Sequence, residues 1–394
     1  MVFNLIKTNL SIQFLVLLIL SSVFGSYLPE IVIRFFYTIS LIIRDILFFL
    51  LPMITFCCLF SCFSNIKNNN TIKIMGFLLV IVFASNYFST ILAFIIGSCI
   101  FIEFNKDNFG ILKDIGELLP LWEFKITPWV ANDVALLVGL GLGYLSSFSR
   151  VSFLIKIHNQ SGKLVTWFLT KLFVPILSLF ALGFILKIQC SNTFISSMHS
   201  YISLMGVIAL TYAFYILFLF AIAANFNFKS WVFYLKNVVP VMFTALSTMS
   251  SLITMPVTLR AAEKNTNNEN FMRLVIPATV NVHTIGLAIG IPLIALTILT
   301  DFGHAHPSFM AYSKFALFFV LAQFAIAAVP GSGILIMVPL LEKYLGFTSE
   351  MSALIVALYI LFDPIETVAN TLGNSAFAII LHNLTTRLKV PLLT

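Results

Sequence analysis

One apolar stretch, residues 354–384, is long enough to cross a bilayer and also carries side chains that can bind a polar ligand. These side chains are Asp363, Glu366, Thr367, Asn370 and Asn374. Their spacing follows the i, i+3, i+4, i+7 pattern, so they fall on one face of a helix. An ionisable group in hydrocarbon costs about 2.5–3.5 kcal/mol on insertion scales, which makes an intramembrane pair of acids a mark of function. The stretch therefore predicts a buried site for a polar solute or an ion.

The competing interpretation is a polar seam between packed helices, in which Thr and Asn side chains form hydrogen bonds across the interface. Such a seam does not need two carboxylates.

The composition predicts an all-α polytopic membrane protein. Of 394 residues, 60% are hydrophobic and 9% are charged, whereas about a quarter of residues are charged in soluble domains. The five cysteines form no CxxC pair, so we expect neither a disulfide framework nor a metal site, and no cofactor. Most Lys and Arg residues lie in short loops, where they set topology. The net charge of +7 therefore does not indicate nucleic acid.

The hydropathy pattern predicts eight transmembrane helices, each with at least about 20 residues. They are expected at 8–28, 39–62, 74–102, 129–149, 164–187, 200–225, 271–299 and 350–384. Two shorter apolar segments, 238–260 and 318–345, are interrupted by Ser-rich and Pro/Gly-rich centres. Irregular backbone at membrane depth is tolerated only where protein or a cavity surrounds it. Both segments are therefore predicted to be re-entrant hairpins.

The loop charges predict that both termini are cytoplasmic. Lysines and arginines gather in alternate loops, and the loop at 103–125 carries five acids against three lysines. The expected location is a plasma membrane, or the inner membrane of a bacterium, with lipid as the surrounding partner.

Two other classes of protein would fit parts of the sequence. An intramembrane serine protease would use Ser332 beside a histidine such as His283, but no orienting acid or oxyanion donor is indicated. A receptor or channel without transport activity would bind solute without flux.

Several motifs, in order along the chain, resemble those of the dicarboxylate/amino acid:cation symporter family, the glutamate transporter homologues. Residues 247–251 read STMSS, 254–258 read TMPVT, and 329–333 read VPGSG. The first two resemble the first hairpin of that family, and the third resembles the tip of its second hairpin. Asp363, with the Thr, Asn and Gly residues that follow it, is in register with the family's last helix. The resemblance covers nearly the whole length.

The resemblance implies an elevator-type transporter with inverted repeats that works as a homotrimer and is not an enzyme. Residues 1–72 would supply scaffold helices 1 and 2, and 103–190 would supply an outer loop and scaffold helices 4 and 5. Residues 73–102 would be transport-domain helix 3, and 191–394 the rest of that domain, with both hairpins. The two hairpins would act as gates.

The resemblance also implies roles for individual residues. Ser250 and Ser251 would offer polar groups to a substrate carboxylate, and Ser332 and Thr367 would also bind the substrate. Asp363 would pair with the amino group of the substrate, and Asn370 would bind its α-carboxylate. Gly331 and Gly333, with Ser332 between them, would form the movable tip of the second gate, where glycine permits close backbone approach. Together these roles imply an amino acid as ligand.

One departure from the family affects substrate choice. The family's arginine, which pairs with an acidic substrate side chain, aligns with Glu366. A carboxylate there repels an acidic side chain in a desolvated site. Glu366 could instead attract a cationic side chain, carry a proton, or pair with a basic group elsewhere.

A second departure affects ion coupling. In an alignment without gaps, the family's sodium-binding aspartate becomes Ile285 and the last aspartate of its final helix becomes Asn374. An alignment shifted by two residues places His283 at the first of these positions, still without an aspartate. Isoleucine offers a hard cation no side-chain oxygen, whereas histidine can titrate near neutral pH.

These observations predict a secondary transporter of a neutral or cationic amino acid, coupled to protons more than to sodium. His283, Glu366, Asn370 and Asn374 are the candidates for coupling. A sodium-coupled symporter of dicarboxylates or acidic amino acids remains an alternative, as does an exchanger with little ion coupling.

Overall fold

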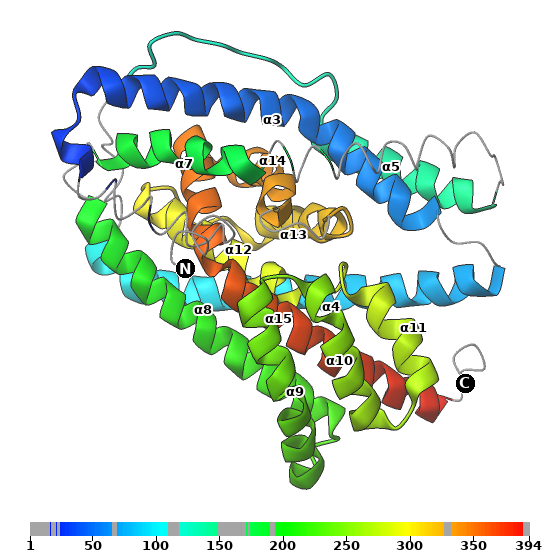
Figure 1. Ribbon diagram of the computed structural model, residues 1–394. Coiled ribbons are helices and arrows are strands. Elements are labelled where there is room, and N and C mark those ends of the chain that lie inside the picture. Colours follow the sequence, from blue (N-terminus) through cyan, green and yellow to red (C-terminus); the bar gives the residue numbers. More distant parts are fainter. Residues whose placement is uncertain are drawn as a thin grey trace.

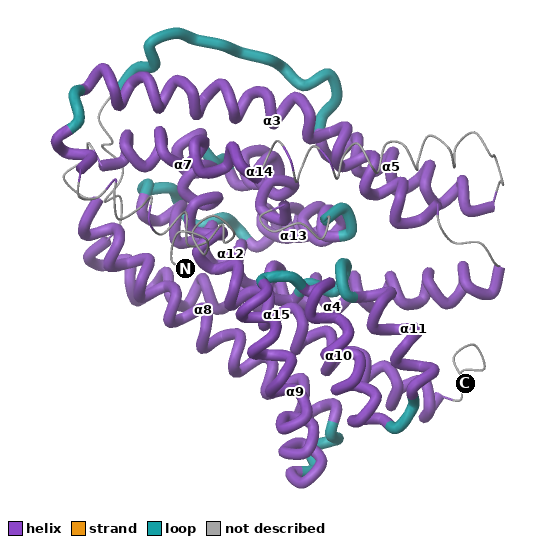
Figure 2. The backbone as a smooth tube through the Cα atoms, in the orientation of Figure 1, coloured by secondary structure: helices purple, strands orange, loops and turns teal. Residues whose placement is uncertain are grey.

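The computed structural model describes residues 24–64, 69–108, 118–148, 174–189, 194–326 and 332–388, together with the single positions 16, 21, 167 and 171. Within these ranges every regular element is a helix, and no strand is present. Figure 2 shows helices joined by mostly short loops. The predicted all-α class is confirmed.

The chain begins its described part with a short 3-10 turn, Gly25–Tyr27, followed by long helices. These are α3 (Glu30–Ser64), α4 (Asn69–Asn108), α5 (Asn132–Phe148), α7 (Val174–Gln189) and α8 (Phe194–Ala223). The C-terminal half contains shorter helices and one long last helix. They are α9 (Phe228–Thr248), α10 (Ser251–Thr266), α11 (Glu269–Thr279), α12 (Ile285–Asp301), α13 (Phe309–Gln323), α14 (Ser332–Leu345) and α15 (Ser349–Leu388).

Four of the described helices are long and apolar enough to cross a bilayer. Their spanning parts are Glu30–Cys57, Gly76–Cys99, Tyr201–Ala223 and Ser349–Arg387. Shorter apolar stretches lie in α5, α12 and α13. The expected span at 8–28 lies largely outside the described residues, and the expected span at 164–187 is described mainly over α7.

The helices form two groups in space (Figure 1). Helix α3 packs against both α5 and α7. In the second group, α15 packs against α8, α9, α10, α11, α12 and α14, while α4 packs against α12 and α13. Helix α15 begins beside α7 and then runs through the second group (Figure 1).

The first interrupted segment forms a helical hairpin, as predicted, from α9 and α10. The two arms meet at Met249, which has the left-handed conformation (φ 49°), and at Ser250, which caps α10. The Ser250 hydroxyl accepts a hydrogen bond from the Ile253 amide (3.4 Å). This capping use of serine is common at helix N-termini. The hairpin extends beyond the predicted 238–260.

The second interrupted segment is an α13–α14 pair, also as predicted. Its tip, residues 327–331, lies outside the described residues, and so does the predicted gate residue Gly331. The arms pack against each other, and α14 contacts α3, α5 and α15 as well.

The expected single span at 271–299 is two helices, α11 and α12, separated by residues 280–284. The chain leaves the helix after Val280 and resumes at Ile285. The side chain of Asn86, from α4, donates to the Val282 carbonyl across the break (2.8 Å). The break thus exposes backbone groups inside the protein, where polar side chains satisfy them.

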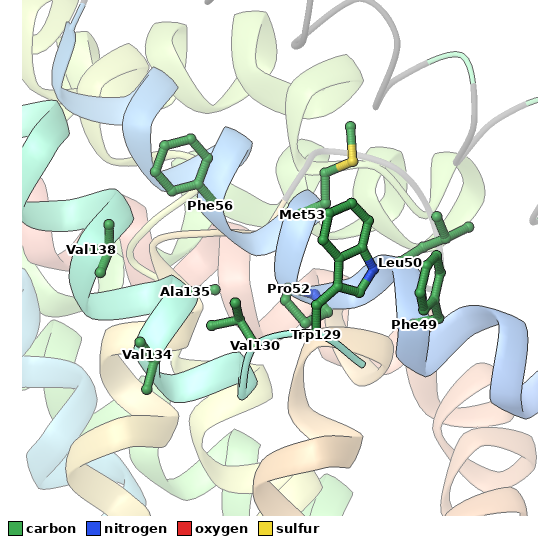
Figure 3. Close-up of a pocket in the computed structure, with 10 residues that line it drawn as sticks. All are labelled: Phe49, Leu50, Pro52, Met53, Phe56, Trp129, Val130, Val134, Ala135 and Val138. Carbon is green, nitrogen blue, oxygen red and sulfur yellow. The ribbon is translucent and has the colours of Figure 1, made fainter. Parts of the chain in front are cut away.

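A separate apolar groove of about 480 Å³ lies between α3 and α5 (Figure 3). Its lining includes Phe49, Pro52, Met53 and Trp129. No predicted site residue lines it, and its apolar walls offer no groups for a charged solute.

Candidate functional site

The polar face of α15 is buried in the protein. Asp363, Glu366, Thr367 and Asn370 are each at most 7% exposed. They lie on the helix that packs against α12, both arms of the first hairpin and α14. The structure therefore places the two acids inside the protein.

Glu366 is held by neutral hydrogen-bond donors. Its Oε1 accepts from the Tyr359 hydroxyl (3.2 Å) and from the Asn370 amide nitrogen (3.3 Å). Among the described residues, neither Glu366 nor Asp363 forms an ion pair with a basic side chain. A buried carboxylate without a cationic partner is costly. The pair is therefore suited to a cation or a proton.

Asn370 connects α15 to the start of α12. Its Oδ1 accepts from the amides of Gly286 (2.8 Å) and Leu287 (3.4 Å). The first amides of a helix have no intrahelical acceptor, so Asn370 supplies one from a neighbouring helix. The Tyr212 hydroxyl of α8 donates to the Gly286 carbonyl (2.7 Å).

The contact between α12 and α15 depends on glycine. A Cβ on Gly286 would lie 2.6 Å from the Glu366 carbonyl oxygen and 3.0 Å from Asn370 Oδ1. A Cβ on Gly373 would overlap the side chain of Ile285. Glycine at these positions lets the two helices approach until the break lies against the polar face of α15.

His283 lies in the break and is fully buried. Its Nε2 hydrogen-bonds with the Ser85 hydroxyl of α4 (2.9 Å). Its ring stacks on Phe377 of α15, with 4.2 Å between ring centres. Phe377 lies about three turns, or about 16 Å, beyond Glu366 along α15. His283 and Glu366 therefore occupy different levels of the helix, and no described hydrogen bond joins them.

Asn374 lies between these two levels. Its Oδ1 accepts from the Thr279 hydroxyl of α11 (2.7 Å), while its Nδ2 has no partner. Near the break, three further buried polar atoms also lack a protein partner among the described residues: Asn86 Oδ1, His283 Nδ1 and Thr284 Oγ1. Buried polar groups of this kind commonly complete their hydrogen bonds with ordered water.

The described residues contain no group of three or more His, Cys, Asp or Glu that could hold a metal ion. The oxygen atoms beside the break come from neutral side chains. Any cation at the break would therefore be bound without a carboxylate from the break itself.

The structure brings only some of the predicted residues together. The side chains of Glu366 and Asn370 contact each other, and Asp363 and Thr367 are buried beside them on α15. Ser250 is used in capping α10, and none of the described hydrogen bonds joins its side chain to α15. A Cβ on Gly333 would lie 2.8 Å from the Tyr359 hydroxyl. The start of α14 therefore lies against Tyr359, which donates a hydrogen bond to Glu366. The side chain of Ser332 is not described.

Four polar residues of this region were not predicted from the sequence. Tyr359 lies two turns before Glu366 on the same face of α15, a spacing visible in the sequence. Ser85 and Asn86 form a polar pair inside the span expected at 74–102, which was a second available signal. Tyr212 has no local signal, because only the packing of α8 on α12 gives it its role.

A family model described as "Sodium:dicarboxylate symporter family" matches residues 133–384. The "Excitatory amino acid transporter" of Caenorhabditis elegans is 28% identical over 151 residues, which cover 38% of this chain and 30% of that protein. "Excitatory amino acid transporter 3" of Oryctolagus cuniculus is 33% identical over 137 residues, covering 34% and 25%. Human "Excitatory amino acid transporter 1" is 28% identical over 155 residues, covering 39% and 28%. The matched region spans less than a third of each of these relatives.

Proposed function

The chain belongs to the sodium:dicarboxylate symporter family, and from this premise we propose that it is a secondary transporter that carries a neutral or cationic amino acid. The relatives it resembles are named as transporters of excitatory amino acids. The substrate proposed here is neutral or positively charged, and in this it departs from what the resemblance to the family implies.

The observation that carries the proposal is the environment of Glu366. Its carboxyl is 3% exposed and contacts only neutral donors in the described residues, with Asp363 one turn before it. An acidic substrate side chain at this place would add a third carboxylate to a desolvated site, where repulsion between like charges is strong. A cationic group would supply the partner that both acids lack.

The same environment supports proton coupling. When no cationic substrate is bound, a proton on one of the two carboxyls removes an unpaired buried charge. The Asp363–Glu366 pair would then hold either a proton or the cationic group of the substrate, but not both. Such competition suits a transporter that exchanges a proton for the solute. His283 is a second proton carrier in this proposal, and it acts separately because it contacts Ser85 and Phe377 instead of Glu366.

Sodium coupling is a second candidate, favoured by one observation. The polar atoms without partners beside the helix break include the oxygens of Asn86 and Thr284, and sodium prefers oxygen ligands. The absence of a carboxylate at Ile285 argues against strong binding. Sodium would therefore bind weakly if it binds here.

The proposal includes the assembly and its setting. We infer a homotrimer in a plasma or bacterial inner membrane, with both termini cytoplasmic. The trimer is supported by family membership, and the orientation is supported by the loop charges. Helices α3, α5 and α7 would form the scaffold, and the second group of helices would form the moving transport domain.

The test is uptake of labelled lysine, arginine, alanine, serine and aspartate into proteoliposomes, with proton and sodium gradients imposed separately. We expect a proton gradient to drive uptake of a neutral or basic amino acid; for a basic amino acid the acidic side must be inside the vesicles, because its binding displaces a proton. In Glu366→Gln, uptake of lysine or arginine should fall at least about tenfold, the equivalent of about 1.4 kcal/mol. Glu269→Gln, which alters an exposed acid in α11, is the matched control and should transport normally.

Sodium-driven uptake of aspartate that survives Glu366→Gln would contradict the proposed substrate and coupling. Saturable binding of an amino acid without any flux would favour a receptor on the same fold.

A further inference from the structure

Three side chains from three helices meet where α15 begins. Lys187 Nζ of α7 donates to Glu350 Oε1 (2.9 Å) and to the Tyr37 hydroxyl of α3 (3.0 Å). The Tyr37 hydroxyl donates to the same Glu350 oxygen (3.2 Å). The Lys187 ammonium also lies 4.3 Å from the centre of the Tyr37 ring. Each group thus contacts the other two.

This triad joins the two groups of helices. Tyr37 and Lys187 belong to α3 and α7, whereas Glu350 lies in the first turn of α15. A second ion pair crosses the same boundary nearby, between Lys343 of α14 and Asp133 of α5. Lys343 near the end of α14 and Glu350 in the first turn of α15 therefore lie on either side of the turn that connects the second hairpin to the last helix.

The triad is largely withdrawn from solvent. The Lys187 and Glu350 side chains are 11% and 21% exposed, and Tyr37 is 5% exposed. The Lys343–Asp133 pair is more open, since the lysine side chain is 48% exposed. A buried charge that loses its partner is heavily penalised. Any displacement of α15 along α7 must therefore separate Lys187 from Glu350 at a cost, or provide new partners.

We propose that Glu350, Lys187 and Tyr37 form a latch that holds α14 and α15 against α3, α5 and α7 in the conformation described here. Sliding of the second group of helices past the first breaks the latch. The charge and hydrogen bonds of the triad thereby set how much of the population occupies this conformation. The latch rests on the proposed function only in that transport supplies the reason for such sliding.

The test uses cross-linking as a report of position, because it needs no substrate. Asp133→Cys and Lys343→Cys, in a chain whose five native cysteines are replaced by alanine, place two thiols where the second ion pair joins the groups. A short bifunctional thiol reagent then links α5 to α14 in this conformation. We expect Glu350→Gln and Lys187→Met each to lower the initial linking rate about threefold, since the latched population falls.

Exchange of the charges, Lys187→Glu together with Glu350→Lys, should restore the rate, because the pair forms again with reversed polarity. Glu263→Gln is the control: it breaks an ion pair with Arg273 that lies within the second group, and it should leave the rate unchanged. Tyr37→Phe keeps the ring and removes the hydroxyl. The Tyr37→Phe variant should lower the initial linking rate. If the charge variants do not fold, this variant alone tests the latch.

Equal linking rates in all folded variants would overturn the latch. Variants that lose thermal stability while the linking rate stays constant would also overturn it, because the triad would then be a fixed structural contact. Uptake measured on the same variants keeps the two proposals separate. A wild-type protein that moves no amino acid would contradict the proposed function and leave the linking result valid.

Discussion

At the scale of single residues, Asn370 links Glu366 to the broken helix. Its amide nitrogen donates to Glu366 (3.3 Å), and its oxygen accepts from the Gly286 amide (2.8 Å). A ligand that competes for Glu366 would therefore also affect the orientation of the group that caps α12. The resemblance to the family implied only that Asn370 binds a substrate carboxylate.

Replacement of Asn370 by alanine should destabilise the protein. The Gly286 amide would lose its acceptor in a buried place, which costs about 1–3 kcal/mol. Thermal unfolding in detergent measures the effect as a lower melting temperature. Asn370→Asp keeps an acceptor for the Gly286 amide but places a second carboxylate beside Glu366. That carboxylate would repel the α-carboxylate of the substrate, so this variant should weaken the binding of neutral amino acids. A melting temperature for the alanine variant equal to that of the wild type would show that water replaces the amide without cost.

The sequence predicted part of this site and missed the rest for a physical reason. Asp363, Glu366, Thr367 and Asn370 lie on one helix, so their common face follows from helical periodicity alone. Ser85 and Tyr212 come from α4 and α8, and only the packing of these helices on α12 brings them near. Periodicity carries no information on that packing.

At the scale of elements, the α12–α15 interface determines where the site can form. The two hairpins were predictable, because Ser, Pro and Gly interrupt their apolar runs. The break at 280–284 lies inside one continuous apolar run that contains only weak interruptions. Side chains of other helices, such as Asn86 and Asn370, satisfy the backbone groups at the break, so its exact position depends on tertiary contacts.

Gly286→Ala tests this interface. The added methyl group would lie 2.6 Å from the Glu366 carbonyl oxygen, so α12 must move away from α15 or strain must accumulate. Overpacking of this kind costs about 1–3 kcal/mol, and amino acid uptake should fall with it. The matched control is Gly206→Ala in α8, where a Cβ meets nothing within 4 Å and alanine should stabilise the helix by about 0.5–1 kcal/mol. Equal melting temperatures for the two variants would contradict a close interface.

At the scale of the whole molecule, the proposed binding face and the proposed latch lie on the same helix. Glu350 lies in the first turn of α15, at the boundary with α7. Glu366 lies about four turns further along the helix, inside the second group. A rigid α15 would therefore carry the bound solute whenever the latch opens. Binding and movement would be coupled through the position of one helix, without a chain of intermediate contacts.

Thermal unfolding in the presence of amino acids tests whether the solute binds at Glu366, and it does not require proteoliposomes. A ligand at about 100 times its dissociation constant stabilises the protein to which it binds by about 2.7 kcal/mol. Lysine, arginine or a neutral amino acid should raise the melting temperature of the wild type, and aspartate should not. In Glu366→Gln the shift caused by a basic amino acid should disappear, whereas in Glu269→Gln it should persist, because that acid is exposed on α11. A shift with aspartate that Glu366→Gln leaves intact would mean that the ligand meets α15 in an orientation that avoids Glu366, and the charge argument for the substrate would fail.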